Sequence, residues 1–236
     1  MKKALILAGG FGTRLREVVK DVPKPMVLFV GKPFLEHQMR YLKTQGIEEV
    51  ILAVHYWADK IKSYFRDGRR INMNITYSDE DTPLGTAGAL KKAENLLDEN
   101  FVLVNGDTYH DIDYKNILNF HKKNKAFITI ASHRANENNK NFHRFLEEEG
   151  KVKEYYGRKE HSYSNAAATG IFVINKEILK KIEEGVAVSL EYELIDYYAR
   201  RGKVFTIVSD SYYRDIGTPK DCEEFGEDIK NKIVHV

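Results

Sequence analysis

The chain has 236 residues, of which 42% are hydrophobic, so it can bury the core of one medium α/β domain. Its 37 Lys and Arg residues nearly balance its 35 Asp and Glu residues, and this balance argues against a dedicated nucleic-acid-binding protein. Cys222 is the only cysteine, which excludes an internal disulfide and fits a reducing compartment. The apolar run Lys3–Ala8 is too short for a signal peptide or a membrane span. We therefore expect a cytoplasmic globular protein with neither a membrane nor a nucleic acid as partner.

Strands and helices alternate along the first 132 residues. Short apolar runs predict buried strands, and stretches with apolar residues on one face predict helices. The predicted strands are Lys3–Ala8, Glu49–His55, Ile71–Tyr77, Phe101–Val104 and Ala126–Ser132. The predicted helices are Pro33–Gln45, Trp57–Phe65, Gly85–Leu97 and Tyr114–Lys123. Because this alternation is typical of right-handed βαβ units, it predicts a Rossmann-like α/β fold with a mixed, mainly parallel sheet flanked by helices.

The stretch from His133 to Asn165 breaks this alternation. It is polar, with four asparagines between positions 136 and 141, and we interpret it as a small β-rich insertion beside the sheet. The later predicted elements are a strand at Thr169–Ile174, helices at Lys176–Glu184 and Leu190–Arg200, a strand at Lys203–Val208 and a last helix from about Thr218. No linker or repeat divides the chain, so we predict a single domain over residues 1–236 with a lobe at about 133–165.

A glycine-rich segment follows the first predicted strand. It reads Gly9-Gly10-Phe11-Gly12-Thr13-Arg14-Leu15, and its glycines let backbone N–H groups approach an anion closely. A helix that begins near Thr13 would add its positive end. A Walker loop would need Gly-Lys-Ser/Thr at its end, and a dinucleotide-binding fingerprint would need a glycine at position 15. Both are excluded, which leaves a phosphate-binding loop of another kind or a tight turn without a ligand.

Two cations accompany this segment. Arg14 lies within it, and Lys24 is stiffened by prolines on both sides, at positions 23 and 25. Two more basic residues, at positions 16 and 20, fall between them. Together these charges indicate a site for a polyphosphate, and a solvated basic face is the alternative.

The chain resembles the sugar-1-phosphate nucleotidylyltransferases in a series of motifs that keep the family's order. The first motif, Leu-Ala-Gly-Gly-x-Gly-Thr-Arg-Leu followed by Pro-Lys-Pro-Met, is long and specific. The other motifs are Leu84-Gly85-Thr86-Ala87-Gly88-Ala89, Val104-Asn105-Gly106-Asp107, Ala168-Thr169-Gly170 and Asp215-Ile216-Gly217-Thr218-Pro219. The chain most resembles the D-glycero-D-manno-heptose 1-phosphate guanylyltransferase branch, and the mannose-1-phosphate enzymes come next.

The resemblance implies transfer of a nucleoside monophosphate from a nucleoside triphosphate to a sugar 1-phosphate, with release of pyrophosphate. Arg14 and Lys24 would be the catalytic residues, because cations can stabilise charge that develops on the phosphates. Asp107 and Asp215 would hold Mg²⁺, which prefers a few carboxylates plus phosphate oxygens. Turn capping is the alternative for Asp107, and an ion pair with Arg214 or capping of the final helix is the alternative for Asp215.

The resemblance also assigns residues to the nucleotide, and one of them indicates the base. Glu80 lies five residues before Gly85, in the segment that lines the base in this family. Since a carboxylate can accept from both the N1–H and the 2-amino group of guanine, Glu80 favours GTP over UTP and dTTP. A solvated acidic loop is the alternative for Glu80. The implied nucleotide-binding residues are Ala8, Gly9, Gly10, Gly12, Thr13, Glu80, Gly85 and Thr86.

The acceptor side departs from the family pattern. The stretch around Lys140-Asn141-Phe142 lacks the glycine of an Arg-Tyr-Gly turn, and Gly157-Arg158 stands where relatives carry Glu-Lys. The insertion at 133–165 would form this side of the site. The residues implied to bind the sugar phosphate are Arg158, Lys159, Asn165, Thr169 and Gly170. Side chains that either line a sugar pocket or cover a sheet face are Tyr155, Tyr156, His161 and Tyr163.

Because the acceptor side departs from the sequence pattern of the family, two other functions stay open. One is cytidylyl or uridylyl transfer to another phosphorylated acceptor, and the other is a non-catalytic nucleotide-sensing subunit of the same fold. The main expectation is a GTP-binding guanylyltransferase of nucleotide-sugar biosynthesis. Its expected partners are a nucleoside triphosphate and a heptose or mannose 1-phosphate, its cofactor is Mg²⁺, and a homo-oligomer is left open.

Overall fold

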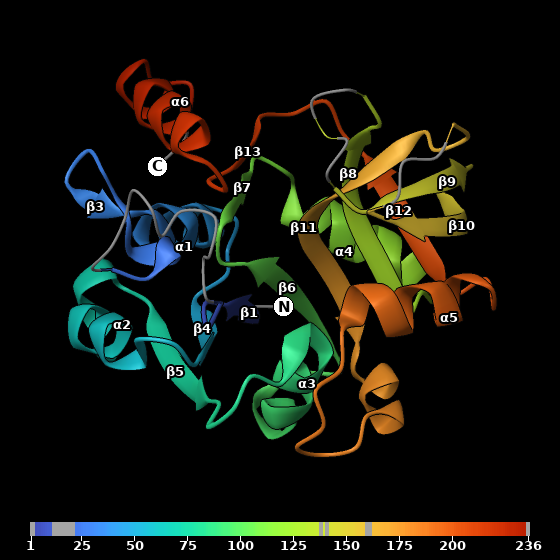
Figure 1. The fold of residues 1–236 in the computed structure, drawn as a ribbon, viewed down its shortest axis with the longest axis horizontal. Coiled ribbons are helices and arrows are strands. Elements are labelled where there is room, and N and C mark those ends of the chain that lie inside the picture. Colours follow the sequence, from blue (N-terminus) through green and yellow to red (C-terminus); the bar gives the residue numbers. More distant parts are fainter. Residues whose placement is uncertain (1–2, 11–21, 137–138, 140–141, 159–161, 235–236) are drawn as a thin grey trace. The chain divides into compact units, whose positions relative to one another are not determined.

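The computed structural model describes residues 3–10, 22–136, 139, 142–158 and 162–234 (Figure 1). The chain groups into two compact units. The first unit comprises residues 1–83, 104–111 and 212–236, and the second comprises residues 84–103 and 112–211. Strand β6 (Asn100–Asn105) is divided between them, because its last two residues belong to the first unit.

The first unit alternates strands with helices before it receives two late elements from the end of the chain. Its strands are β1 (Lys3–Leu7), β2 (Leu28–Phe29), β3 (Lys32–Pro33), β4 (Glu49–Val54), β5 (Asn74–Asp79), β7 (Thr108–His110) and β13 (Tyr213–Asp215). Its helices are α1 (Phe34–Thr44), α2 (Ala58–Phe65) and α6 (Pro219–Lys230), with 3₁₀ turns η2 (Lys24–Met26) and η3 (Arg69–Ile71).

Three parallel strands form the central sheet of the first unit, in the order β5-β4-β1. Strands β1 and β4 are apolar because both faces are covered, and Leu5 and Leu52 are fully buried, whereas β5 carries exposed polar residues. The carboxyl ends of parallel strands share one edge of a sheet, which is where ligands bind in open α/β folds. Ala8, His55 and Glu80 follow the three strands at that edge.

Helix α1 forms where the sequence predicts a helix. Pro33 precedes it with a φ of −59°, a value that suits the entry to a helix, and Gly46 follows it with a φ of +82°. Phe34 and Met39 on its apolar face are fully buried. Local signals and burial agree here, so the prediction of a helix at Pro33–Gln45 is confirmed.

The second unit carries the remaining elements. Its strands are β8 (Ile128–Arg134), β9 (Arg144–Glu148), β10 (Lys151–Gly157), β11 (Ala166–Asn175) and β12 (Val204–Val208). Its helical elements are α3 (Gly85–Lys92), α4 (Tyr114–Lys123) and α5 (Asp196–Ala199), the 3₁₀ turns η4 (Glu94–Leu96) and η6 (Lys176–Lys181), and the π-helix η7 (Leu190–Ile195).

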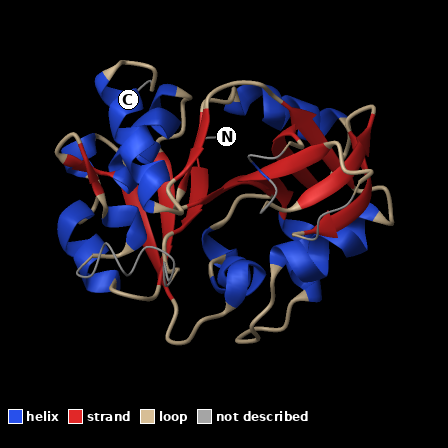
Figure 2. Cartoon of the chain, turned by 45° about the horizontal axis from the view of Figure 1, so that its top comes forward, coloured by secondary structure: helices blue, strands red, loops and turns tan. Residues whose placement is uncertain are grey.

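The strands of the second unit follow the order β11-β8-β12-β10-β9. Strand β12 runs parallel to β8, whereas β11–β8, β10–β12 and β9–β10 are antiparallel. Strand β9 also pairs with β11. The polar stretch at 133–165 therefore contains a β-rich segment, drawn in red in Figure 2, whose two strands pair with other strands of this unit.

The predicted fold class, an α/β fold with a mixed sheet, is confirmed by this arrangement. The mainly parallel character holds in the first unit, whereas most pairings of the second unit are antiparallel. The division into one domain with a lobe at about 133–165 stays a prediction. No helix within the described part of the chain has the length and the apolar character to cross a membrane.

The predicted boundaries differ from the structure at several places, and the helix predicted at Lys176–Glu184 is the shorter 3₁₀ turn η6. Strand β5 begins at Asn74 rather than Ile71, because Arg69–Ile71 forms a 3₁₀ turn and Asn72 takes a left-handed φ of +54°. The helix predicted to reach Leu97 breaks after Lys92 and continues as a 3₁₀ turn. The helix predicted at 190–200 begins as the π-helix η7 and becomes α-helical only at α5.

Candidate active site

A lysine and two carboxylates meet in the first unit. Lys24 Nζ lies 2.5 Å from Asp107 Oδ2 and 3.7 Å from Asp215 Oδ1. The lysine side chain is 9% exposed, and the two carboxylates are partly accessible, at 31% and 23%. One ammonium therefore neutralises part of the charge of two carboxylates that ligands can still reach, and the structure brings together three of the predicted site residues.

The turn after β6 places Asp107. Gly106 fits against β1, where an added Cβ would lie only 2.5 Å from the carbonyl oxygen of Leu7, and its N–H donates to that oxygen. On the other side, Gln38 Nε2 of α1 donates to the carbonyl oxygens of Asn105 and Thr108. The turn is thus fixed from both sides, and this explains the need for glycine at position 106.

A short antiparallel pair places Asp215 beside Asp107. In β13, Asp215 pairs with Thr108 of β7, and the N–H of Ile216 donates to the carbonyl oxygen of Asp107. The preceding residue, Arg214, forms ion pairs with Glu224 and Asp228 of α6. Strand β13 is therefore held to β7 by its backbone and to the last helix by its side chains.

Helix α6 begins directly after this pair, as the sequence predicts. Thr218 accepts a hydrogen bond from the N–H of Asp221, and the Asp221 carboxylate accepts from the N–H of Thr218. Pro219 occupies the first helical position. Both ends of the segment that carries Asp215 are therefore fixed.

The donor set at this cluster fits Mg²⁺. The described residues hold no group of three or more His, Cys, Asp or Glu side chains that could enclose a metal. Mg²⁺ does not need such a cage, because it is usually held by one or two carboxylates and takes its other oxygens from water and phosphate. Asp107 and Asp215 supply two carboxylates at one point, with Lys24 between them.

The predicted nucleotide residues of the first unit gather at the carboxyl edge of its sheet. The N–H of Ala8 donates to the carbonyl oxygen of Ala53, and a Cβ on Gly9 would lie 2.9 Å from the backbone nitrogen of His55. The ring of His55, through Nδ1, is 2.8 Å from the carbonyl oxygen of Glu80. The first glycines and Glu80 are therefore linked through His55, at the ends of β1, β4 and β5.

Gly10 is exposed, and a Cβ would meet nothing there. Five candidate site residues lie outside the described part of the chain, so their expected roles stay predictions. They are Gly12, Thr13, Arg14, Lys159 and His161.

In the second unit, Gly85 and Thr86 make close contacts with a distant segment. Gly85 has a φ of +69°, and a Cβ on it would lie 2.6 Å from the carbonyl oxygen of Val188. Thr86 Oγ1 donates to Glu191 Oε2 at 2.6 Å and accepts from the N–H of Leu190 at 2.7 Å. These contacts give both residues a structural role at the start of α3, in addition to the predicted nucleotide binding.

Three predicted acceptor residues have partners inside the second unit. Thr169 is buried and donates to the carbonyl oxygen of Ala131, and Gly170 is buried in β11 with a φ of +80°. Asn165 bonds twice to the backbone of Glu147, accepting from its N–H and donating to its carbonyl oxygen, each at 2.8 Å. Arg158 alone of the described acceptor predictions presents an exposed charge.

A polar cluster around Arg158 includes residues that sequence reasoning missed. Arg158 Nε donates to His143 Nε2 at 3.2 Å, and the His143 ring lies over Tyr155 and against the edge of Tyr192. Burial lowers the pKa of His143 to about 4, and the nearby Glu191 carboxylate opposes this shift. His143 directly follows the stretch where the family's glycine turn is missing, and that position was the available signal.

A lysine–carboxylate cluster beside a glycine-bearing edge of a parallel sheet suits a ligand that carries phosphate groups. The family described as nucleotidyl transferase matches residues 3–232 of the chain. The chain belongs to the nucleotidyl transferase family, and its fold is the Rossmann-like α/β fold of that family. The expected nucleotidyltransferase resemblance is thereby confirmed.

Three relatives illustrate the similarity. The D-glycero-alpha-D-manno-heptose 1-phosphate guanylyltransferase of Campylobacter jejuni is 37% identical over 94% of this chain and 98% of its own length. Mannose-1-phosphate guanyltransferase beta-B of Xenopus laevis is 35% identical over 93% of this chain, which spans only 62% of that relative. The crystal structure of HddC from Yersinia pseudotuberculosis complexed with GMP-PN is 30% identical, covers 97% of this chain and all of its own, and has a TM-score of 0.85.

Proposed function

We propose that this protein transfers the guanylyl group of GTP to the phosphate of a heptose or mannose 1-phosphate and releases pyrophosphate. The observation that carries the proposal is the cluster of Lys24, Asp107 and Asp215 in the first unit. It occurs in a chain that is similar over nearly its whole length to heptose 1-phosphate guanylyltransferases. The product would be a GDP-sugar made in the cytoplasm.

The proposed reaction forms one phosphorus–oxygen bond and breaks another. A phosphate oxygen of the sugar 1-phosphate attacks the α-phosphorus of GTP, and the bond from that phosphorus to the bridging oxygen breaks. Pyrophosphate leaves with the electron pair, so negative charge develops on the transferring phosphate and on the leaving group. Positioning and charge stabilisation supply most of the rate in such chemistry.

The cations of the first unit fit this charge development. Lys24 stands beside the two carboxylates, and Arg14 would form a fork of hydrogen bonds with phosphate oxygens. Asp107 and Asp215 would hold Mg²⁺, which neutralises charge on the triphosphate when it is bound. Release of Asp107 from Lys24 to the metal would free the ammonium for phosphate.

The nucleotide would be bound through backbone groups and one carboxylate. Ala8 to Gly10, together with Gly12 and Thr13, would bind the phosphates, and the family resemblance implies that Gly85 and Thr86 also bind the nucleotide. Glu80 would accept from the N1–H and 2-amino group of guanine. Its backbone is fixed by Val54 and His55, so the side chain starts from a rigid point.

The acceptor would be bound by the second unit. The small insertion containing β9 and β10 would form this side, and Arg158 with Lys159 would bind the phosphate of the sugar. The additional acceptor residues would be Asn165, Thr169 and Gly170. A homo-oligomer stays an open expectation.

One assay tests the proposed function. The whole protein is supplied with Mg²⁺, each of GTP, UTP, CTP and dTTP in turn, and either mannose 1-phosphate or D-glycero-α-D-manno-heptose 1-phosphate. Pyrophosphate release and the nucleotide sugar are then measured. We expect product with GTP and at least one of the two sugar phosphates. Absence of turnover with both acceptors would contradict the proposal, and turnover with CTP or UTP alone would favour the alternative pyrimidine reaction.

A further inference from the structure

Among the buried side-chain atoms of the second unit that lack a hydrogen-bond partner in the described residues, two belong to adjacent rings. One is Nδ1 of His143, just before β9, and the other is the hydroxyl oxygen of Tyr155 in β10. Buried polar groups are nearly always paired in folded proteins, because an unpaired one loses its water without replacement. Two such atoms in adjacent side chains need an explanation.

These two side chains belong to one cluster. Their rings are stacked, with centroids 5.9 Å apart and planes 17° apart, and the ring of Tyr192 from η7 meets His143 edge-on at 5.1 Å. A Cβ added to Gly157 would lie 4.0 Å from His143 Nδ1 and 3.6 Å from the Tyr192 ring. Nδ1 therefore faces the place where any other residue at position 157 would carry its side chain.

The hydrogen bond from Arg158 determines which ring nitrogen of His143 carries the proton. With a pKa lowered to about 4 by burial, the imidazole is neutral near pH 7 and carries a single N–H. Because Arg158 Nε donates to Nε2, that nitrogen is the acceptor and the proton lies on Nδ1. The unpartnered Nδ1 is therefore a buried hydrogen-bond donor.

A carboxylate completes the cluster. Glu191 acts electrostatically on both His143 and Tyr155, so its charge lies near both. Its hydrogen bonds from Thr86 and Ser189 both go to Oε2, and the described residues give Oε1 no hydrogen bond. The cluster thus offers a donor, a hydroxyl that can donate or accept, and a carboxylate acceptor, with the Arg158 cation beside them.

We propose that His143 Nδ1–H and the Tyr155 hydroxyl bind hydroxyl groups of the acceptor sugar, and that Arg158 both binds its phosphate and fixes the proton of His143. This inference rests on the proposed function and names the residues that recognise the acceptor sugar. A hydroxylated ring suits the cluster because each hydroxyl both donates and accepts.

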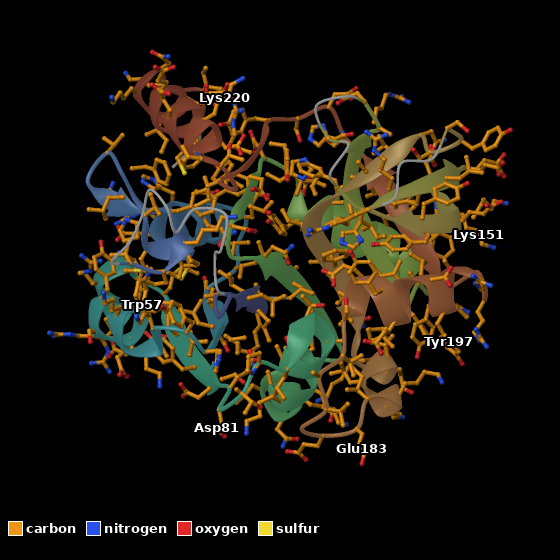
Figure 3. All side chains as sticks on the ribbon, in the orientation of Figure 1. Trp57, Asp81, Lys151, Glu183, Tyr197 and Lys220 are labelled. Atoms are coloured by element: carbon orange, nitrogen blue, oxygen red, sulfur yellow. The ribbon has the colours of Figure 1, made fainter. Side chains whose placement is uncertain are left out.

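Two substitutions of His143 separate its two nitrogens. In His143→Asn the amide nitrogen replaces the donor at Nδ1, and in His143→Gln the longer side chain serves the Nε2 side and loses that donor. Tyr155→Phe removes the hydroxyl and keeps the ring. Tyr197→Phe removes a hydroxyl from α5, where Lys181 and Arg201 flank the ring, and serves as the control (Figure 3).

Binding and turnover are measured separately on the whole protein. Calorimetry gives the Kd of mannose 1-phosphate and of D-glycero-α-D-manno-heptose 1-phosphate, and pyrophosphate release gives kcat and the KM of each substrate. We expect His143→Gln and Tyr155→Phe to raise the Kd of the bound sugar phosphate about tenfold and to leave the KM of GTP unchanged. His143→Asn should stay within about threefold of the wild type, as should Tyr197→Phe.

The outcomes distinguish this inference from the proposed function. An unchanged sugar-phosphate Kd in both His143→Gln and Tyr155→Phe would overturn the inference, even if the wild type releases pyrophosphate. If the wild type binds a sugar phosphate but releases no pyrophosphate, the proposed function fails, and the expected pattern of Kd values would still support the inference. Failure of the wild type to bind either probe would overturn it. Far-UV circular dichroism identifies any variant that does not fold, and His143→Asn then decides whether the donor at Nδ1 matters.

Discussion

Lys24, Asp107 and Asp215 in the first unit satisfy one another, whereas His143 and Tyr155 in the second unit hold buried polar atoms that no described residue satisfies. The first group is made of full charges, which the fold can keep close together only in opposite signs. The two side chains of the second group are neutral and are held by ring packing and by the hydrogen bond from Arg158, while one polar atom of each has no partner. We infer that the charges of Lys24, Asp107 and Asp215 balance one another before a substrate binds. The unpaired atoms of His143 and Tyr155, in contrast, would gain hydrogen-bond partners only when the acceptor sugar binds.

The largest effect on turnover is expected for the charged cluster of Lys24, Asp107 and Asp215. Asp107→Asn keeps the shape of the turn and removes a proposed metal ligand, so we expect kcat to fall by about 10²–10³-fold. Pyrophosphate release with GTP, a sugar 1-phosphate and Mg²⁺ measures this. Asp59→Asn, at an exposed position in the first turn of α2, should change kcat less than twofold. A near-normal rate in Asp107→Asn would mean that Asp107 serves only to balance Lys24.

A substitution at Glu80 should change the preference for guanine by a smaller factor than Asp107→Asn changes kcat. Glu80→Gln replaces a double acceptor by a group with one acceptor and one donor, so the preference for GTP over UTP and dTTP should fall about tenfold. The ratio of kcat/KM values for the three nucleotides measures the preference. Asp81→Asn changes the neighbouring exposed carboxylate, labelled in Figure 3, and should leave the ratio unchanged. An identical ratio in Glu80→Gln would place the base elsewhere.

His121 offers a comparison for His143, because its ring is buried and has partners at both nitrogens, Thr129 Oγ1 and Asn100 Oδ1. Burial lowers its pKa to about 4. Below a pH of about 6.5, His121 is therefore protonated in the unfolded chain but stays neutral in the folded chain. The free energy of unfolding should then fall by up to about 1.4 kcal/mol for each pH unit, until the pH reaches the pKa of His121 in the folded state.

Denaturant unfolding between pH 7 and pH 4.5 measures this slope. Other histidines contribute to it, so the comparison is with His121→Asn, which should show a shallower slope. Equal slopes for the two proteins would show that His121 keeps an ordinary pKa in the fold.

The smallest expected effect concerns Asn165, which is predicted to bind the sugar phosphate but bonds to the Glu147 backbone. Asn165→Ala should lower the free energy of unfolding by about 1 kcal/mol, which corresponds to about 2–4 °C in Tm. Thermal unfolding measures the loss, and the KM of the sugar phosphate tests the binding role. A tenfold rise in KM with an unchanged Tm would assign Asn165 to the ligand rather than to the fold.

The sequence predicted the strand–helix alternation well where local signals and burial agree, as in α1 and α4. It predicted Lys24, Asp107 and Asp215 as site residues because each lies in a short motif, and the structure brings them together, while their roles stay predictions. It missed the link between His143 and Glu191, since these residues are far apart in sequence and share no motif. Their proximity depends on antiparallel pairing of β9 and β10 and on the π-helix η7, which local periodicity does not encode.

The packing of Val188 against the start of α3 has a consequence for protein engineering. Its carbonyl oxygen accepts from the N–H groups of both Ala87 and Gly88, and it leaves no room for a Cβ on Gly85. A loop exchange that replaces residues 186–191 alone would remove the hydrogen-bond acceptor of two N–H groups in the first turn of α3. Anyone who grafts a new acceptor specificity onto this chain would therefore have to transplant residues 84–88 and 186–191 as a pair.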